Sequence, residues 1–302
     1  MASNATAAAV TEAHRRLQVA IKAEATRLSL DVWPLLDPSR PDATFGAWAE
    51  ANATIIDLAA IESVRAAADY FVTYSAAETG ARYNPPQFPS VSRDRIFGTM
   101  LKVGPDRIGE LLKSGQTLLR AARTAQVEAS GATAMLAMDP QRQGLADATA
   151  ADYGSNPAPK GWARVTSSKP CAFCAFVASR GPVYRSEASA SFRPHKHCGC
   201  TVEPVYSRTA DWPGKGREFK QIYDDAIKQG RQDGDLIRGT DNDYLNAFRR
   251  RFNSLDRQGV DGPGPRVTGE ALSPTQRAIR NTDLSPQERL AAFRERLAEL
   301  EG

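Results

Sequence analysis

The sequence lacks the features typical of membrane, secreted and strongly basic proteins. No apolar run approaches the roughly 20 residues that cross a bilayer, and the opening MASNATAAAVTEAH has no basic region followed by an apolar core, as a signal peptide would. Lys plus Arg is 39 and Asp plus Glu is 35, so the net charge is only +4. We therefore expect a protein without a membrane segment, made in a reducing cytoplasm, whose charge permits transient contact with DNA without favouring it.

The motifs of common enzyme classes are also missing. The chain contains no GxSxG, no HExxH, no GxxxxGK[ST] phosphate loop and no GxGxxG. Histidine, the most frequent general base, occurs only three times. His14 falls on a predicted helix and is expected at the surface, while His195 and His197 belong to a cysteine-containing segment. The sequence therefore identifies no catalytic residues and favours a protein that is not an enzyme.

The region 1–150 is rich in alanine and predicts helices almost throughout. Apolar residues recur at three- and four-residue steps, which is the period of one helix face. This pattern predicts helices at about 11–30, with Thr11 as N-cap, at about 42–74 and at 105–125. The proline-containing stretch 82–92 between the last two is predicted to be a loop.

The region 151–207 has a mixed pattern that predicts a small α+β module. It opens with the linker DYGSNPAP. The predicted elements are strands at 162–166, 183–184 and 201–206 and a short helix at 175–179 that Gly181 ends. The module has few large apolar residues, so we expect it to need another source of stability.

The region 208–302 is polar and predicts an extended helical tail. Helices are predicted at 217–229 and 244–255, and the arginine run at 249–251 is interpreted as a solvated helix face. After the linker GVDGPGP, two more helices are predicted to begin with Ser-Pro. The last one carries an apolar seam of Leu290, Phe293, Leu297 and Leu300. The chain is therefore expected to be α+β, with a helical domain, a small module and a helical tail.

All four cysteines lie in one 30-residue window, and this clustering predicts a metal site. Cys171 and Cys174 form a Cys-x-x-Cys pair, which places two thiolates on one turn within reach of one ion, at about 2.3 Å. His195, Cys198 and Cys200 follow in a His-x-x-Cys-x-Cys pattern. In a cytoplasmic protein such clustering is more typical of metal binding than of disulfides. These five residues are the predicted ligands of a structural zinc ion.

The sequence does not choose among the possible ligand sets, because a structural zinc ion takes four ligands. Cys171, Cys174 and Cys200 are the first choice, completed by Cys198, by His195 or by both, with His197 beside them. Structural zinc is favoured because its binding, about 10–16 kcal/mol, becomes folding energy for a module with little core.

Three other interpretations of the cluster stay open, together with a fourth, weaker one. A catalytic zinc ion would need a general base, for which Glu187 and Glu203 are the candidates. A redox Cys-x-x-Cys pair is the second, and a nucleophilic cysteine paired with His195 or His197 is weaker. The third is a disulfide between one cysteine of the first pair and one of the second, which would require a location outside the cell.

The Cys/His segment also resembles a known family. The residues that carry the resemblance are Cys171, Cys174, Gly181, His195, Cys198, Cys200 and Pro204. This arrangement resembles the phage Mu F-like domain of minor head proteins. The amino-acid sequence of the segment is most similar to the version of this domain in tailed phages of actinobacteria. The resemblance covers about 45 residues, and in those phages the domain likewise follows a long helical region.

The resemblance implies a virion protein of a tailed bacteriophage that acts in head morphogenesis. Such a minor capsid protein associates with the portal and the capsid interior during procapsid assembly and DNA packaging. The implied partners are the portal protein and the major capsid or scaffold protein. The resemblance also implies a low-copy component that is oligomeric in the virion and is assembled in the host cytoplasm. Related phage proteins are often labelled capsid maturation proteases, so cleavage of scaffold or capsid protein is the alternative function.

Overall fold

The chain folds into a mainly helical α+β structure, as the sequence predicts. The computed structural model describes residues 5–150, 157–167, 170–182, 198–207, 212–234, 236 and 241–257. Its helices are α1 (Ala5–Asp31), the 3-10 turn η1 (Trp33–Leu35), α2 (Pro41–Thr79), α3 (Arg93–Val103), α4 (Pro105–Lys113), α5 (Leu118–Ala150), α6 (Ala172–Ala178), α8 (Gly216–Gln232) and α9 (Asp241–Arg257). Its strands are β1 (Gly161–Val165) and β2 (Thr201–Val205).

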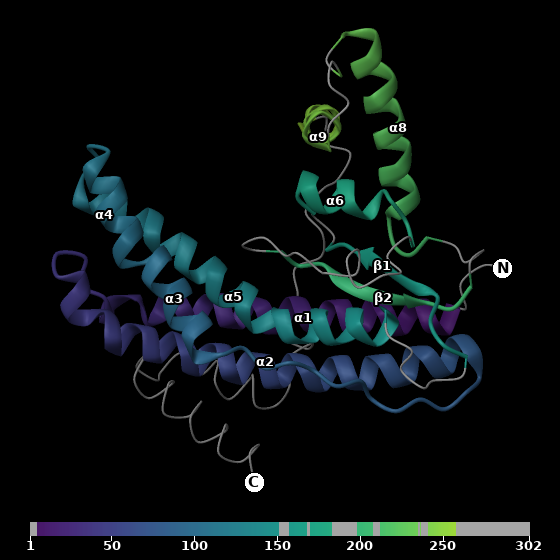
Figure 1. Cartoon of the computed structure of the whole chain (residues 1–302), viewed down its shortest axis with the longest axis horizontal. Helices are drawn as coiled ribbons and strands as arrows, with labels where there is room; N and C mark the ends of the chain where they lie inside the picture. Colours follow the sequence, from purple (N-terminus) through teal and green to yellow (C-terminus); the bar gives the residue numbers. More distant parts are fainter. Residues whose placement is uncertain are drawn as a thin grey trace.

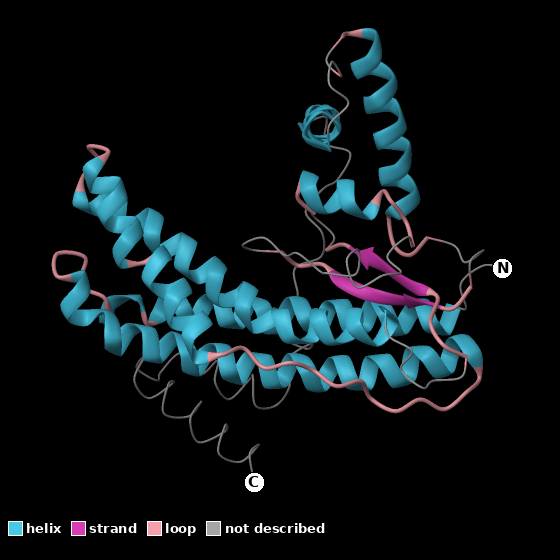
Figure 2. Cartoon of the chain, in the orientation of Figure 1, coloured by secondary structure: helices cyan, strands magenta, loops and turns pink. Residues whose placement is uncertain are grey.

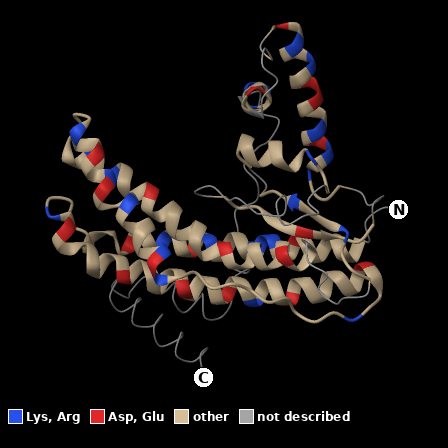
Figure 3. Ribbon diagram, in the orientation of Figure 1, with Lys and Arg blue, Asp and Glu red and all other residues tan. Residues whose placement is uncertain are grey.

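The described elements form three layers. The long helices α1, α2 and α5 run side by side, β1 and β2 lie against this bundle, and α6, α8 and α9 stand beyond the sheet (Figures 1 and 2). Lys and Arg are interspersed with Asp and Glu along these helices (Figure 3). None of the described helices combines the length and hydropathy that crossing a bilayer requires.

The first helix begins earlier than predicted, and Thr11 is not its cap. α1 starts at Ala5, so Thr11 lies inside it and is buried. The Thr11 hydroxyl lies 3.2 Å from the hydroxyl of Tyr70 on α2. Alanine favours the helix from its first turn, and the buried partner on α2 explains why a polar residue is placed there.

The predicted helix at 105–125 is wrong, because the structure divides it in two. α4 ends at Lys113 and α5 begins at Leu118, with Gly115 between them at a φ of 85°. A left-handed backbone of this kind ends a helix and favours glycine. Apolar residues at 111–112 and 118–119 continue the helical period across the turn, which is why the sequence suggested one helix. The helix α3 was not predicted from the sequence.

The predicted start of α2 is close to the observed one, whereas the helix continues past the predicted end at about 74 to Thr79. α2 begins with Pro41 in its first turn and ends at Gly80, whose φ is 74°, in agreement with the usual positions of these residues. The predicted loop at 82–92 is confirmed and crosses α5 at Gly144. A Cβ at Gly144 would lie 2.8 Å from the carbonyl oxygen of Gln87 and closer still to the ring of Phe88. Only glycine therefore allows this loop to lie on α5.

A buried polar triad joins α1, α2 and α5. The hydroxyls of Ser29 and Thr133 donate hydrogen bonds of 2.7 and 2.8 Å to the side-chain oxygen of Asn52. The amide nitrogen of Asn52 donates to the carbonyl of Trp48 at 3.0 Å. Because an unpaired buried polar group is costly, this triad fixes how the three helices are aligned.

Replacing Asn52 with leucine is expected to destabilise the bundle by about 2 kcal/mol, since two buried hydroxyls lose their acceptor. Urea denaturation measured by circular dichroism gives the free energy of unfolding. Adding Ser29→Ala and Thr133→Val to Asn52→Leu should recover part of the loss, because all partners are then apolar. If the triple variant is no more stable than Asn52→Leu alone, the triad does not act as described.

The two predicted strands at 162–166 and 201–206 are confirmed. β1 and β2 pair antiparallel, with Trp162 opposite Pro204 and Val165 opposite Thr201. The short helix is confirmed as α6, and Gly181 follows it with a φ of 69°. The predicted strand at 183–184 lies outside the described residues.

The described part of the tail packs on the module. α8 and α9 extend the helices predicted at 217–229 and 244–255, and Phe219 and Phe248 share a buried cluster with Phe176 of α6. A second buried cluster combines Phe71 of α2 with Trp162 of β1 and the three buried cysteines. The division into 1–150, 151–207 and 208–302 stays a prediction. The seam at 290–300 lies outside the described residues.

Candidate metal centre

Three of the four cysteine thiols meet in one buried site. Cys174 lies on α6, and Cys198 and Cys200 lie on the segment that leads into β2. Their Sγ atoms all lie within 4.8 Å of one another, with 3.6 Å between those of Cys174 and Cys198, and they are only 1–2% exposed. Sulfurs that share a tetrahedral zinc ion lie about 3.8 Å apart, since each is about 2.3 Å from the metal. The three thiols could therefore hold one metal ion.

Cys171 lies at the edge of this site. It is the N-cap of α6, where its Sγ accepts a hydrogen bond from the backbone N–H of Cys174 at 3.4 Å. Cys171 is exposed. The hydrogen bond between its thiol and that of Cys174 is the largest cause of the raised pKa of Cys174. The predicted ligand His195 and its neighbour His197 lie outside the described residues. The fourth ligand of a metal ion could therefore be either Cys171 or His195.

The thiols of Cys174 and Cys200 favour their neutral form until a cation joins them. The Cys171, Cys198 and Cys200 thiols and burial together raise the pKa of Cys174 far above its usual range. The hydrogen bond with Cys174 lowers the pKa of Cys200, but Cys198 and burial outweigh it and raise that pKa to about 12. A divalent metal ion supplies the positive charge that removes such protons. The donor set fits a metal ion that prefers sulfur.

Arg142 of α5 holds the segment that carries two of the thiols. Its Nη2 donates to the carbonyl of Cys198 at 2.6 Å and its Nε to the carbonyl of Cys200 at 3.1 Å. The arginine is only 2% exposed. Hydrogen bonds from a charged donor are about twice as strong as neutral ones, so this contact fixes the backbone on which Cys198 and Cys200 lie.

Two more cations surround the thiols. Burial and the charge of Arg142 lower the pKa of Lys22 on α1, while the thiols of Cys198, Cys200 and Cys174 oppose this shift. Arg164 on β1 is buried and lowers the pKa of Cys200. A zinc ion bound by three or four thiolates carries a net negative charge. Positive side chains from three elements match that charge.

The roles of Arg142, Lys22 and Arg164 were not predicted from the sequence. A signal exists for Arg142, because the apolar residues Met138 and Leu145, four positions before it and three after it, share its face of the helix, where an arginine needs a partner. No comparable signal exists for Lys22, because nothing in the sequence pattern around it predicts that it lies near the thiols. Their roles depend on contacts between α1, α5 and the module.

The structure separates Glu203 from the thiols. Alternate residues of a strand point to opposite faces, and the carboxyl of Glu203 accepts hydrogen bonds from Thr11 of α1 and Tyr74 of α2. It is therefore not a general base for a metal at the cysteine site. Glu187, the other candidate base, lies outside the described residues.

The geometry of the site also bears on the disulfide and on the redox Cys-x-x-Cys pair. All four cysteines are free thiols, and the 3.6 Å between the sulfurs of Cys174 and Cys198 is far longer than the roughly 2.05 Å of a disulfide. β1 and β2, which flank α6 in the chain, are antiparallel. A thioredoxin-like redox pair would need the parallel strands of a βαβ unit.

His14 is buried, so the predicted surface position is wrong. Its ring stacks on Tyr70 with 4.2 Å between centroids, and its Nε2 lies 3.2 Å from the hydroxyl of Thr201 on β2. Burial lowers the pKa of His14 to about 3. A histidine beside a hydroxyl is the arrangement of an activated nucleophile, but both residues are buried and no substrate reaches them. The pair links α1 to the sheet.

Replacing Glu203 with glutamine is expected to change how stability depends on pH. Burial raises the pKa of Glu203 from 4.5 to about 7, against the hydrogen bonds from Thr11 and Tyr74. A raised pKa stabilises the fold below about pH 4.5, and this stabilisation is lost as pH rises through 7, by up to about 3 kcal/mol. Urea denaturation between pH 4.5 and 8 should therefore show this loss in the unmodified protein and not in Glu203→Gln.

Two comparisons make the Glu203 result specific. The exposed Glu218→Gln should keep the slope of the unmodified protein. His14 contributes in the opposite direction in both proteins, because its lowered pKa removes stability as pH falls from 6.5 through about 3. Equal slopes for Glu203→Gln and the unmodified protein would contradict the assignment.

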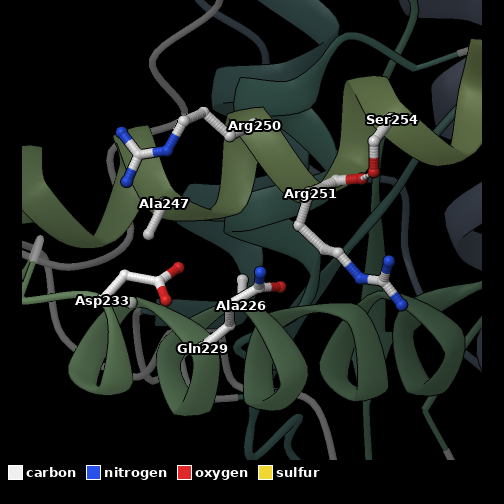
Figure 4. A pocket seen from close by; sticks show the side chains of 8 residues that line it. Ala226, Gln229, Asp233, Ala247, Arg250, Arg251 and Ser254 are labelled. Carbon is white, nitrogen blue, oxygen red and sulfur yellow. Dashed lines mark hydrogen bonds between the residues drawn. The ribbon is translucent and has the colours of Figure 1, made fainter.

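A hollow between α8 and α9 contains charges of both signs. It measures about 460 Å³, with Gln229 and Asp233 of α8 on one side and Arg250 and Arg251 of α9 on the other (Figure 4). Arg251 lies 3.7 Å from Asp225. These mixed charges agree with the interpretation of the arginine run as a solvated face.

Comparison with known proteins identifies a family. The VG15 protein family matches residues 4–226, which include Arg142 and all four cysteines. The Gene 15 protein of Mycobacterium phage D29 is 32% identical, over a region that covers 32% of this chain and 50% of that protein. The chain thus spans about half the length of this curated relative. No solved structure matches. Since the match covers most of the chain, the protein belongs to the VG15 protein family and is related to a bacteriophage protein.

Proposed function

We propose that this protein is a minor head protein of a tailed bacteriophage, which acts in head morphogenesis and whose α+β module is stabilised by a structural zinc ion. The observation that carries the proposal is the meeting of Cys174, Cys198 and Cys200 in one buried site. These residues belong to the pattern that resembles the phage Mu F-like domain. The relationship to a phage protein supports the same conclusion.

The zinc ion would be held by Cys174, Cys198, Cys200 and either Cys171 or His195. When bound, it would cross-link Cys174 of α6 to Cys198 and Cys200 on the segment before β2 by coordination bonds. Arg142 continues this link to α5 through the carbonyls of Cys198 and Cys200. The module and the bundle then form one unit with a fixed surface, which is what a protein that positions other head components requires.

In this role the protein would lie in the capsid interior or at the portal. It would contact the portal protein and the major capsid or scaffold protein, as a low-copy oligomer in the virion that is assembled in the host cytoplasm. The protease alternative gains no support from the His14–Thr201 pair, which is buried. Its other candidate bases, His195 and His197, lie outside the described residues.

Quantitative mass spectrometry of purified procapsids and virions tests the proposed role. We expect peptides of this chain in both particles, at fewer copies than the major capsid protein, and no DNA-filled heads from phage with a nonsense mutation in its gene. Absence from both particles would overturn the proposal. Co-expression with scaffold and capsid protein should leave both at full length, and their cleavage would favour the protease.

A further inference from the structure

The turn between α4 and α5 exposes several large apolar side chains. Leu112, Leu118, Leu119 and Val127 are 41%, 40%, 64% and 56% exposed. We call these four residues and the cations between them the hairpin tip. Figure 1 shows α4 and the first turns of α5 projecting from the bundle, far from β1 and β2. Apolar side chains gathered on a projecting element are typical of a binding surface.

The backbone of the hairpin tip is ordered by its own hydrogen bonds. The N–H of Gly115 donates to the carbonyl of Leu112 at 2.9 Å, and that of Gln116 to the carbonyl of Leu111 at 3.1 Å. The hydroxyl of Thr117 accepts from the N–H of Arg120 at the start of α5, at 3.4 Å. The tip is therefore a preformed surface, and binding would cost little ordering.

The exposed side chains follow from how α4 and α5 pack. Ile108 and Leu111 of α4 are buried together with Ala121 and Ala125 of α5, and the residues beside them point outward. On α5, Leu119, Arg123 and Val127 lie four residues apart, so they form one stripe on the outer face. The tip therefore combines apolar and basic side chains.

The cations of the hairpin tip have no ionic partner among the described residues. Arg107 pairs with Glu110 and Glu128, whereas no acidic group lies within ion-pair distance of Lys113, Arg120 or Arg123 in the part of the chain that the structure describes. Unpaired cations around apolar side chains favour a partner that carries both apolar and acidic groups.

We propose that the hairpin tip binds an acidic amphipathic helix of another protein. Leucine-type side chains of that helix would pack on Leu112, Leu118, Leu119 and Val127, and its acidic side chains would pair with Lys113, Arg120 and Arg123. A second copy fits less well, because a two-fold contact would place the same cations against each other. The proposal depends neither on the metal nor on a role in the head.

A designed peptide provides the probe. The full-length chain is titrated into a fluorescent 18-residue helical peptide with leucines on one face and glutamates beside them, and into a second peptide with lysines in place of the glutamates. Fluorescence anisotropy should show at least about tenfold tighter binding of the acidic peptide, and weaker binding at higher salt. Equal affinity for the two peptides would overturn the proposal.

Variants locate the binding to the hairpin tip. Arg120→Glu combined with Arg123→Glu should reverse the preference between the peptides, and Leu119→Ser should weaken the acidic one. The matched control, Arg249→Glu with Arg250→Glu on α9, should change neither. Circular dichroism confirms that each variant is folded. An unchanged preference in the first double variant would place the binding elsewhere.

Cross-linking separates the other possible occupants. Benzoylphenylalanine placed at Leu119 of the full-length chain is irradiated with the acidic peptide present, and the linked residues are identified by mass spectrometry. Links to the peptide support the proposal. Links mainly to residues 258–302 or to a second copy would overturn it. Tighter binding to vesicles containing phosphatidylglycerol than to the peptide would show that the tip is instead a membrane contact.

Discussion

Replacing Cys200 with serine is expected to abolish metal binding and to unfold the α+β module. Cys200 is buried beside Cys174 and Cys198, and serine is a poor ligand for a metal that prefers sulfur. Because binding of structural zinc supplies about 10–16 kcal/mol that becomes folding energy, this variant should show the largest loss of stability. Metal analysis of purified protein should fall from one zinc ion per chain to none, and the melting temperature should fall with it.

Chelator and a second variant complete this experiment. A strong chelator should lower the melting temperature of the unmodified protein and leave Cys200→Ser unchanged, since that variant has no metal to lose. Cys171→Ser decides the fourth ligand. If Cys171 binds the metal, this variant loses affinity; if His195 does, it keeps the full zinc content. A protein that contains no zinc and does not respond to chelator would rule out the proposed centre.

Replacing Arg142 with methionine should have the second-largest effect. Methionine fills a similar space but cannot donate to the carbonyls of Cys198 and Cys200, which would remain buried without partners. We expect a loss of about 2–4 kcal/mol in the free energy of unfolding. Metal affinity should fall about 10–100-fold, as it does when a group that orients metal ligands is removed. Urea denaturation and competition with a zinc-binding dye measure the two quantities.

The controls for Arg142 separate its charge from its shape. Arg142→Lys keeps the charge but cannot reach both carbonyls, so it should recover only part of the affinity. Gln143→Met, at the neighbouring position on α5, should leave zinc affinity unchanged. If Arg142→Met and Gln143→Met bind zinc equally well, Arg142 does not position the ligands.

Much of the fold could be predicted from local patterns. The period of apolar residues gave α1 and α2, and Gly181 marked the end of α6. These features depend on residues close together in the sequence, which is why they could be read without a structure. The division between α4 and α5 could not, because the apolar period continued through the turn and only the left-handed backbone at Gly115 reveals it.

The candidate site, too, could be predicted from the sequence only as far as local patterns reach. Residue type and spacing placed Cys174, Cys198 and Cys200 among the candidate ligands, and the structure groups these three. The spacing also favoured Cys171 over Cys198, whereas Cys171 is exposed at the edge of the cluster. The supporting cations come from α1, α5 and β1, and no spacing relates Lys22 or Arg142 to a cysteine. His14 was expected at the surface because it lies on a predicted helix, whereas its burial results from β2 lying on that helix. Contacts between distant segments therefore decide the surroundings of the metal.

The helix α5 connects two distant parts of the molecule. One continuous helix carries Leu119 near its first turn and Arg142 near its end, about 35 Å apart at 1.5 Å per residue. Pro140, inside the helix, has no N–H to donate, so one backbone hydrogen bond is missing just before Arg142. The hairpin tip and the arginine that holds the cysteine segment thus lie on one helix, and the interruption in its hydrogen bonding lies directly beside that arginine.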